Sequence, residues 1–147
     1  MKKFQILYLN KNIPIDNFIG GGESIDLEPM MKGIKIGKSK FGNGVFATQD
    51  FAKNEIVEIA PALPIPPKDI QNNILKDYVF TYDTSNYGIV FGYGSIYNHN
   101  DNPSLNYSYT NNHKNMIYKT TRPIKSGEEL FVSYGSHWWK NRNLMPE

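Results

Sequence analysis

Cysteine is absent from this chain of 147 residues. Its absence excludes disulfides, and also the thiolate zinc clusters that hold many small domains together. The three histidines, His99, His113 and His137, are scattered along the chain, so we expect no metal site. A single domain of this length can bury a hydrophobic core without such cross-links.

Charge of one sign and long apolar runs are also scarce. The formal net charge is +2 and no run of Lys and Arg exceeds two residues, so direct binding to nucleic acid is not expected. No apolar stretch is long enough for a transmembrane helix, and the short apolar run near the start is broken by polar residues, unlike a secretory signal. We therefore expect a soluble, intracellular protein that binds no membrane.

Short runs typical of β-strands dominate the sequence from about residue 34 onward. They are rich in Val, Ile, Thr, Tyr and Phe and are bounded by Gly, Pro, Asn or Asp; they cover residues 33–39, 44–50, 55–61, 77–83, 87–94, 104–110, 115–121 and 129–135. The helical candidates, 67–75 and 136–140, span one or two turns, too short for a βαβ crossover. The pattern predicts a mainly β protein built of small sheets.

The sequence divides into three parts. Residues 1–33 are predicted to be an N-terminal extension, with a strand at 4–9 and a flexible glycine-rich joint at 20–22. Residues 34–140 are predicted to form the compact domain, and residues 141–147 a C-terminal tail.

Two glycines flank an asparagine at Gly42-Asn43-Gly44. Neither glycine has a Cβ atom, so the backbone can approach another group closely. A hairpin turn built on the Asn-Gly pair is the alternative interpretation. No helix is expected after this motif, which excludes the phosphate cradles of Rossmann and P-loop proteins.

A second motif, "NHNDNPS", begins at Asn98-His99, directly after an aromatic run that should be buried. A lone histidine is more often a structural residue than a catalytic base, and no Ser and carboxylate set in a recognisable order supports a hydrolase triad. A third motif, "GEELFVSYG" at 127–135, ends in Tyr134 and is followed by two adjacent tryptophans.

In this order, the three motifs resemble the signature of the SET-domain protein lysine methyltransferases, which is an early G-x-G, then N-H-x-x-x-P-N, then G-E-E-L-x-x-x-Y. The resemblance covers residues 34–140 and is greatest to the compact stand-alone SET proteins of large viruses and bacteria. It implies a SET-domain fold of several small, mostly antiparallel sheets with one or two short helices and a knot-like threading of the C-terminal segment. It also implies methyl transfer from S-adenosylmethionine to a lysine side chain of a protein, such as a histone tail or another exposed basic peptide.

The resemblance also implies roles for individual residues. The cofactor, which leaves as S-adenosylhomocysteine, would be held by Gly42, Asn43, Gly44, Tyr97, Asn98, His99, Tyr134 and Trp139, with Trp139 stacked on the adenine. Tyr134 would be the central catalytic residue, Tyr78 would line the lysine channel, and Tyr107 would limit the number of methyl groups. No metal and no dedicated general base are needed, because the sulfonium already carries an activated methyl group.

Several alternatives stay open. Asn100, Ser104 and Ser133 depart from the usual motifs, so a weak or inactive module that only binds peptide or cofactor is the second hypothesis. A nucleic-acid-binding β domain is a distant third, because too few Arg and Lys residues accompany the aromatic residues. A homodimer is open by resemblance to compact relatives, and a histone substrate would place the protein in the nucleus.

Overall fold

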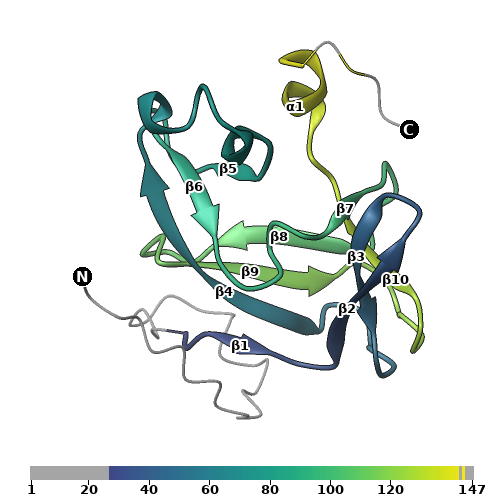
Figure 1. The fold of residues 1–147 in the computed structure, drawn as a ribbon. Helices are drawn as coiled ribbons and strands as arrows, with labels where there is room; N and C mark the ends of the chain where they lie inside the picture. The colour runs from purple at the N-terminus through teal and green to yellow at the C-terminus, as the bar shows by residue number, and fades with distance from the viewer. Residues whose placement is uncertain (1–26, 143, 145–147) are drawn as a thin grey trace.

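The computed structural model describes residues 27–142 and 144, so the strand and glycine joint expected at 4–9 and 20–22 lie outside the described residues. Short strands are the main secondary structure of the described chain (Figure 1), with the bounds β1 Met30–Met31, β2 Ile34–Ser39, β3 Gly42–Ala47, β4 Ile56–Ile65, β5 Val79–Thr81, β6 Tyr87–Val90, β7 Asn98–His99, β8 Leu105–Tyr109, β9 Asn115–Thr120 and β10 Glu129–Val132. The helical segments are η2 Pro67–Asp69, η3 Ile74–Asp77 and α1 Ser136–Lys140.

These strands form two small sheets. The six-stranded sheet has the order β5-β6-β4-β9-β8, with β1 also paired to β4, and the four-stranded sheet has the order β2-β3-β10-β7. All the pairs between these strands are antiparallel except that of β10 with β7. The predicted mainly β fold of small, mostly antiparallel sheets is confirmed.

The parallel pair brings distant parts of the chain together. Phe131 of β10 lies opposite Asn98 of β7, and Val132 lies opposite His99. On its other side β10 pairs with β3, so a strand near the C-terminus lies between two earlier strands. The two-residue β7 was not predicted as a strand, because so short a segment is stabilised by its partner and not by its own sequence.

Pro61 in β4 marks a change of partner along the strand. The sequence placed the end of this strand at Pro61, but β4 continues to Ile65. Up to Pro61 it pairs with β9, and from Ala62 onward with β6. A proline lacks the N–H that a continuous ladder requires, so it is tolerated where the ladder changes from one neighbour to the next.

The hydrophobic core draws on both sheets. Buried side chains come from β3 and β10 of the smaller sheet and from β4 and β9 of the larger one, and include Val45, Ala47, Val57, Ala60, Met116, Tyr118, Leu130 and Val132. The sheets are therefore held together by shared burial of apolar area, at about 25 cal/mol per Å².

Residues before the predicted domain boundary at 34 also contact the larger sheet. Met30 and Met31 pair with Ile59 and Glu58 of β4, and the Leu27 carbonyl accepts a hydrogen bond from the Asn115 side chain. No helix within 27–142 is long and apolar enough to cross a membrane.

Candidate active site

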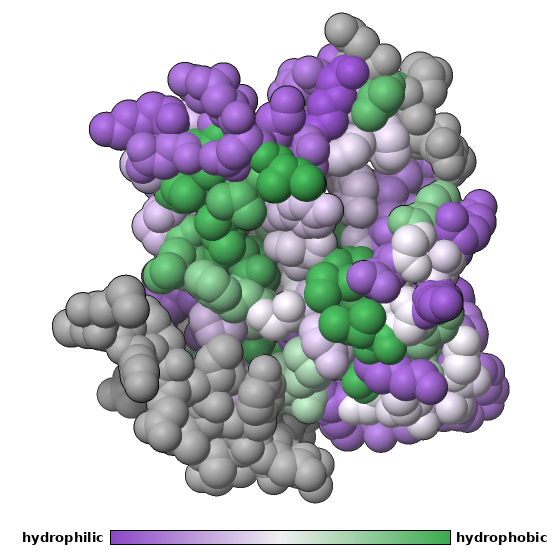
Figure 2. Space-filling model, in the orientation of Figure 1, coloured by the Kyte–Doolittle hydropathy of each residue, from purple (hydrophilic) through white to green (hydrophobic). Residues whose placement is uncertain are grey.

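A cavity of about 790 Å³ opens between β5, the segment before β7 and helix α1. This volume lies within the range of small-molecule sites in proteins. Aromatic side chains form much of its wall, and the lining includes Asn43, Tyr78, Phe80, Tyr97, Asn98, Tyr107, Tyr134 and Trp138. Figure 2 shows hydrophobic side chains on both sides of a paler strip through the middle of this face. Six of the predicted site residues, Asn43, Tyr78, Tyr97, Asn98, Tyr107 and Tyr134, therefore line one cavity.

The two glycines of the G-x-G motif serve different purposes. The turn of the β2–β3 hairpin consists of Lys40 and Phe41, so the alternative of a turn at Asn43-Gly44 is wrong. Gly42 follows this turn at a φ of +107°, a conformation that favours glycine. At Gly44 a Cβ atom would lie 2.3 Å from Glu129 Oε1, so the missing side chain makes room for that carboxylate.

Glu129 and Asn98 join the three motifs. The Asn98 side-chain nitrogen donates to Glu129 Oε1 at 2.8 Å and to the Asn43 carbonyl at 2.9 Å. Glu129 Oε2 accepts a hydrogen bond from Ser39 Oγ at 3.0 Å. Both amide protons of Asn98 therefore have acceptors, and its side-chain oxygen is the atom left to accept a bond from a ligand.

His99 holds the backbone of Tyr134. Its Nδ1 accepts the Tyr134 N–H at 3.1 Å, which leaves the ring proton on Nε2, 3.1 Å from Asp101 Oδ1. The histidine ring also packs edge-on against Trp139, with ring centroids 4.9 Å apart. His99 and Trp139 are not among the residues lining the cavity, but both rings contact the Tyr134 ring, with centroid distances of 5.3 Å and 6.0 Å.

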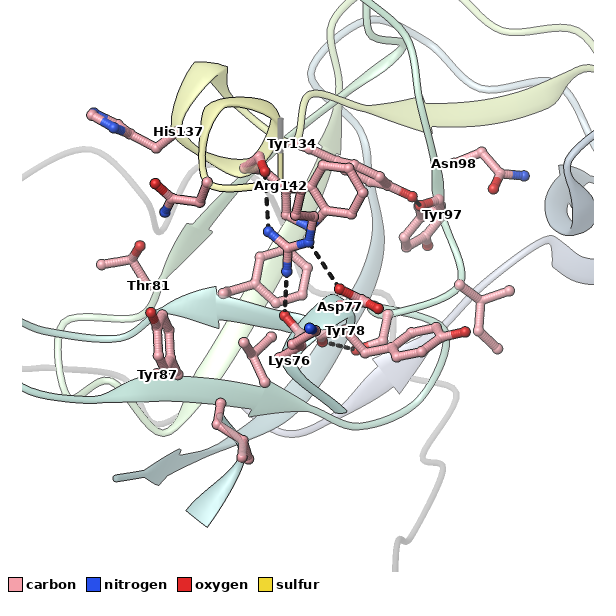
Figure 3. A pocket seen from close by; sticks show the side chains of 18 of the residues that line it. Lys76, Asp77, Tyr78, Thr81, Tyr87, Tyr97, Asn98, Tyr134, His137 and Arg142 are labelled. Atoms are coloured by element: carbon pink, nitrogen blue, oxygen red, sulfur yellow. Dashed lines mark hydrogen bonds and ion pairs between the residues drawn. The ribbon is translucent and has the colours of Figure 1, made fainter. Parts of the chain in front are cut away.

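Tyr134 projects its hydroxyl group toward Tyr97 (Figure 3), where it donates to the Tyr97 carbonyl at 2.9 Å. Burial raises the pKa of Tyr134, and the neighbouring Tyr78 raises it further, so this phenol is neutral at physiological pH. The Tyr107 hydroxyl donates to the Ser133 carbonyl at 3.0 Å, and burial also raises its pKa. Tyr134 and Tyr107 therefore both place a neutral, polar hydroxyl at the tip of an apolar ring.

The hydroxyl of Ser104 supports the same strand. Ser104 Oγ accepts the Phe131 N–H at 2.8 Å, and its side chain is buried. A serine at this position thus stabilises β10 next to Tyr134.

Helix α1 is fastened across the cavity by Arg142, which the sequence placed in a tail. The guanidinium donates from Nε to Asp77 Oδ1 at 2.8 Å and from Nη2 to the Lys76 carbonyl at 2.5 Å (Figure 3). It also lies 4.2 Å from the ring centre of Trp138. Arg142, Asp77 and Trp138 line the cavity and were not predicted. The sequence offers no signal for this contact, because the residues that meet are 65 apart.

The comparisons with known proteins agree with this geometry. The SET domain family model matches residues 42–135. The chain is 31% identical over 102 residues to the Schizosaccharomyces pombe histone-lysine N-methyltransferase specific for H3 lysine-37. This match covers 67% of this chain and 69% of that protein. The chain also resembles the crystal structure of a Plasmodium falciparum protein assigned as a histone methyltransferase, with a TM-score of 0.62 and 36% identity, covering 74% of this chain and 98% of the other.

More distant structures share the fold alone. In a polycomb repressive complex 2 from Chaetomium thermophilum, one chain matches with a TM-score of 0.62 and 22% identity, over 75% of this chain and 16% of the other. The family model covers more than half of the sequence, and its matched range includes the three motifs that meet at the cavity. The chain therefore belongs to the SET-domain family of protein-lysine methyltransferases.

Proposed function

We propose that this protein transfers a methyl group from S-adenosylmethionine to the side-chain amine of a lysine in a protein substrate. The observation that carries the proposal is the placement of Tyr134, a neutral phenol fixed at both its backbone and its hydroxyl inside an aromatic cavity. When bound, the cofactor would supply a methyl group already activated on a cationic sulfur.

The residues around Asn98 fit the polar end of such a cofactor. Its side-chain oxygen accepts hydrogen bonds, which suits the ammonium group of a methionine moiety, and the Glu129 carboxylate adds negative charge behind it. Gly42, where an added Cβ would meet nothing within 4 Å, leaves open backbone next to Asn43. Trp139, whose ring lies next to His99 and outside the lining of the cavity, would stack on the adenine, as the resemblance implies.

The tyrosines would handle the substrate amine. A lysine ammonium has a pKa of about 10.4, so its deprotonation at pH 7 costs about 4.6 kcal/mol. Removal of water by the rings of Tyr78, Phe80 and Tyr107 disfavours the charged amine and so offsets part of that cost. The Tyr134 hydroxyl would orient the neutral nitrogen, since a displacement of about 1 Å can slow an in-line transfer by about 100-fold.

A histone tail is the first substrate to test, because the S. pombe relative is named for lysine 37 of histone H3. We infer a flexible lysine-bearing peptide of this kind, and with it a nuclear location. The proposed experiment incubates the protein with tritiated S-adenosylmethionine and either recombinant histone H3 or a cell extract.

Label on either protein sample supports the proposal, and mass spectrometry then identifies the lysine and the number of methyl groups. Label on neither sample, together with measurable cofactor binding by calorimetry, would favour a module that binds without transfer.

A further inference from the structure

One carboxylic acid, Glu58, is buried away from the cavity surface. Its residue is 1% exposed, on the central strand β4 of the larger sheet. Glu58 Oε1 accepts the Tyr93 N–H at 2.7 Å, and Oε2 accepts the Tyr97 hydroxyl at 2.8 Å. Burying an ionisable group is costly unless it is fully bonded, so its presence calls for a reason.

The local backbone is shaped around this carboxylate. A register shift in the β4–β9 ladder between Ile56 and Glu58 marks a bulge, which can re-aim a side chain. Gly92 adopts a φ of +79°, and a Cβ there would lie 2.3 Å from Glu58 Oε1. The strand and the following turn are therefore both fitted to the carboxylate.

Glu58 connects to the active site through Tyr97. The Tyr97 ring is buried and bonded to Glu58, while the carbonyl of the same residue accepts the Tyr134 hydroxyl at 2.9 Å. Because close-packed interiors transmit small displacements, a shift of the Tyr97 ring moves the acceptor that orients Tyr134.

The hydrogen bonds around Glu58 depend on its proton. A charged carboxylate accepts both donors, Tyr93 N–H and Tyr97 O–H, so each of these two donors is satisfied. Protonation adds a third donor, and a proton on Oε2 competes with the Tyr97 O–H for the space between the two oxygens, so the Tyr97 hydroxyl must turn to accept that proton. The neutral form holds the Tyr97 ring less firmly than the charged form does.

We propose that Glu58 is a positioning residue whose proton state sets the placement of Tyr97 and, through it, of the Tyr134 hydroxyl. The inference rests on the methyl-transfer function proposed above. It makes the rate depend on pH through the protein itself, in addition to the ionisation of the substrate lysine.

Among the described residues, the groups that face Glu58 from the neighbouring elements include no basic side chain that would hold its carboxylate in the charged form. Tyr118 of β9 and Met31 of β1 lie opposite it in the sheet, and Tyr93 and Tyr97 approach from the segment after β6. None of the ion pairs between the residues described for this chain includes Glu58. Burial therefore dominates and raises the pKa of Glu58 to about 7.

The test compares the wild-type protein with Glu58→Gln, which mimics the neutral acid: its amide oxygen can accept from Tyr93 and its nitrogen adds a donor. Tyrosines labelled with ¹³C at Cζ are followed by NMR from pH 5.5 to 8.5, with the Tyr134 signal assigned through Tyr134→Phe. Single-turnover methyl transfer is measured over the same range. Glu28→Gln, at an exposed carboxylate, is the matched control.

In the wild type and in Glu28→Gln, the Tyr134 signal should shift with a midpoint near pH 7, and Glu58→Gln should lack this shift. The ratio of wild-type to Glu58→Gln rates should rise from about 1 at pH 6 to about 10 at pH 8.5. If Glu58→Gln does not fold, Tyr97→Phe removes the same hydrogen bond and should also abolish the shift.

A Tyr134 signal that ignores pH in the wild type, or a rate ratio that is the same at every pH, would overturn the role of Glu58. Absence of methyl transfer by the wild type would instead refute the proposed function, and the NMR titration would still decide the role of Glu58.

Discussion

The side chain of Asn98 donates a hydrogen bond of 2.8 Å to Glu129, although the two residues are 31 positions apart. The parallel pair of β7 and β10 brings them together, and the missing Cβ of Gly44 makes room for the carboxylate. Together with the bond from Asn98 to the Asn43 carbonyl, the bond to Glu129 joins the three sequence motifs into one site.

Glu129→Gln should weaken cofactor binding by about 10-fold, or ~1.4 kcal/mol, because a charge-assisted bond that orients Asn98 is lost. Asn98→Ala should weaken it at least as much. Calorimetry with S-adenosylhomocysteine measures both, with Glu28→Gln as the control for the loss of a carboxylate. Unchanged affinity in the first two variants would place the cofactor elsewhere.

His99→Phe tests the contact with the Tyr134 backbone. The phenyl ring keeps the packing against Trp139 but leaves the Tyr134 N–H without its acceptor, so we expect a loss of about 1–3 kcal/mol in the free energy of unfolding. Asp101→Asn should change stability by less than about 0.5 kcal/mol, since that side chain is 84% exposed. Urea denaturation distinguishes the two, and equal losses would argue against the assigned role of His99.

Helix α1 itself was predicted with its observed bounds, Ser136–Lys140, and the strands other than β1 and β7 were predicted because β-branched and aromatic residues alternate with turn residues in the sequence. The contacts that complete the site were not predictable in the same way. Arg142 follows the helix in a polar segment, and only the fold shows that it reaches Asp77. Glu58 lies in a segment whose sequence is that of an ordinary strand. The bulge after Ile56 and the turn at Gly92, which accommodate its carboxylate in the interior, are visible only in the fold.

Arg142→Lys should loosen helix α1, because lysine keeps the charge but cannot bond Asp77 and the Lys76 carbonyl in one planar fork. We expect faster amide hydrogen exchange in residues 136–142 and a KM for the peptide raised by up to about 10-fold. Arg122→Lys is the control, since Arg122 pairs with Glu128 and is not among the cavity residues. Equal exchange in both variants would contradict the fastening role.

Glu58 should make the free energy of unfolding fall as pH rises through 7. Its pKa rises from 4.5 to about 7 on folding, so the folded state holds this proton more tightly than the unfolded state does. The resulting stability is fully present below pH 4.5 and is lost as pH rises through 7, by at most about 3 kcal/mol. Glu58→Gln should remove this fall, and equal slopes for both proteins between pH 5 and 8 would refute it.

Methyl transfer by Tyr134→Phe, measured beside the wild type, shows whether the Tyr134 hydroxyl orients the substrate amine. We predict that the variant binds S-adenosylhomocysteine within about threefold of the wild type but transfers methyl groups about 100-fold more slowly, because the hydroxyl that orients the amine is gone. The Tyr82 hydroxyl donates to the His113 carbonyl, and Tyr82 does not line the cavity. Tyr82→Phe should therefore transfer methyl groups at the wild-type rate. Full transfer activity in Tyr134→Phe would contradict the role of the Tyr134 hydroxyl in methyl transfer.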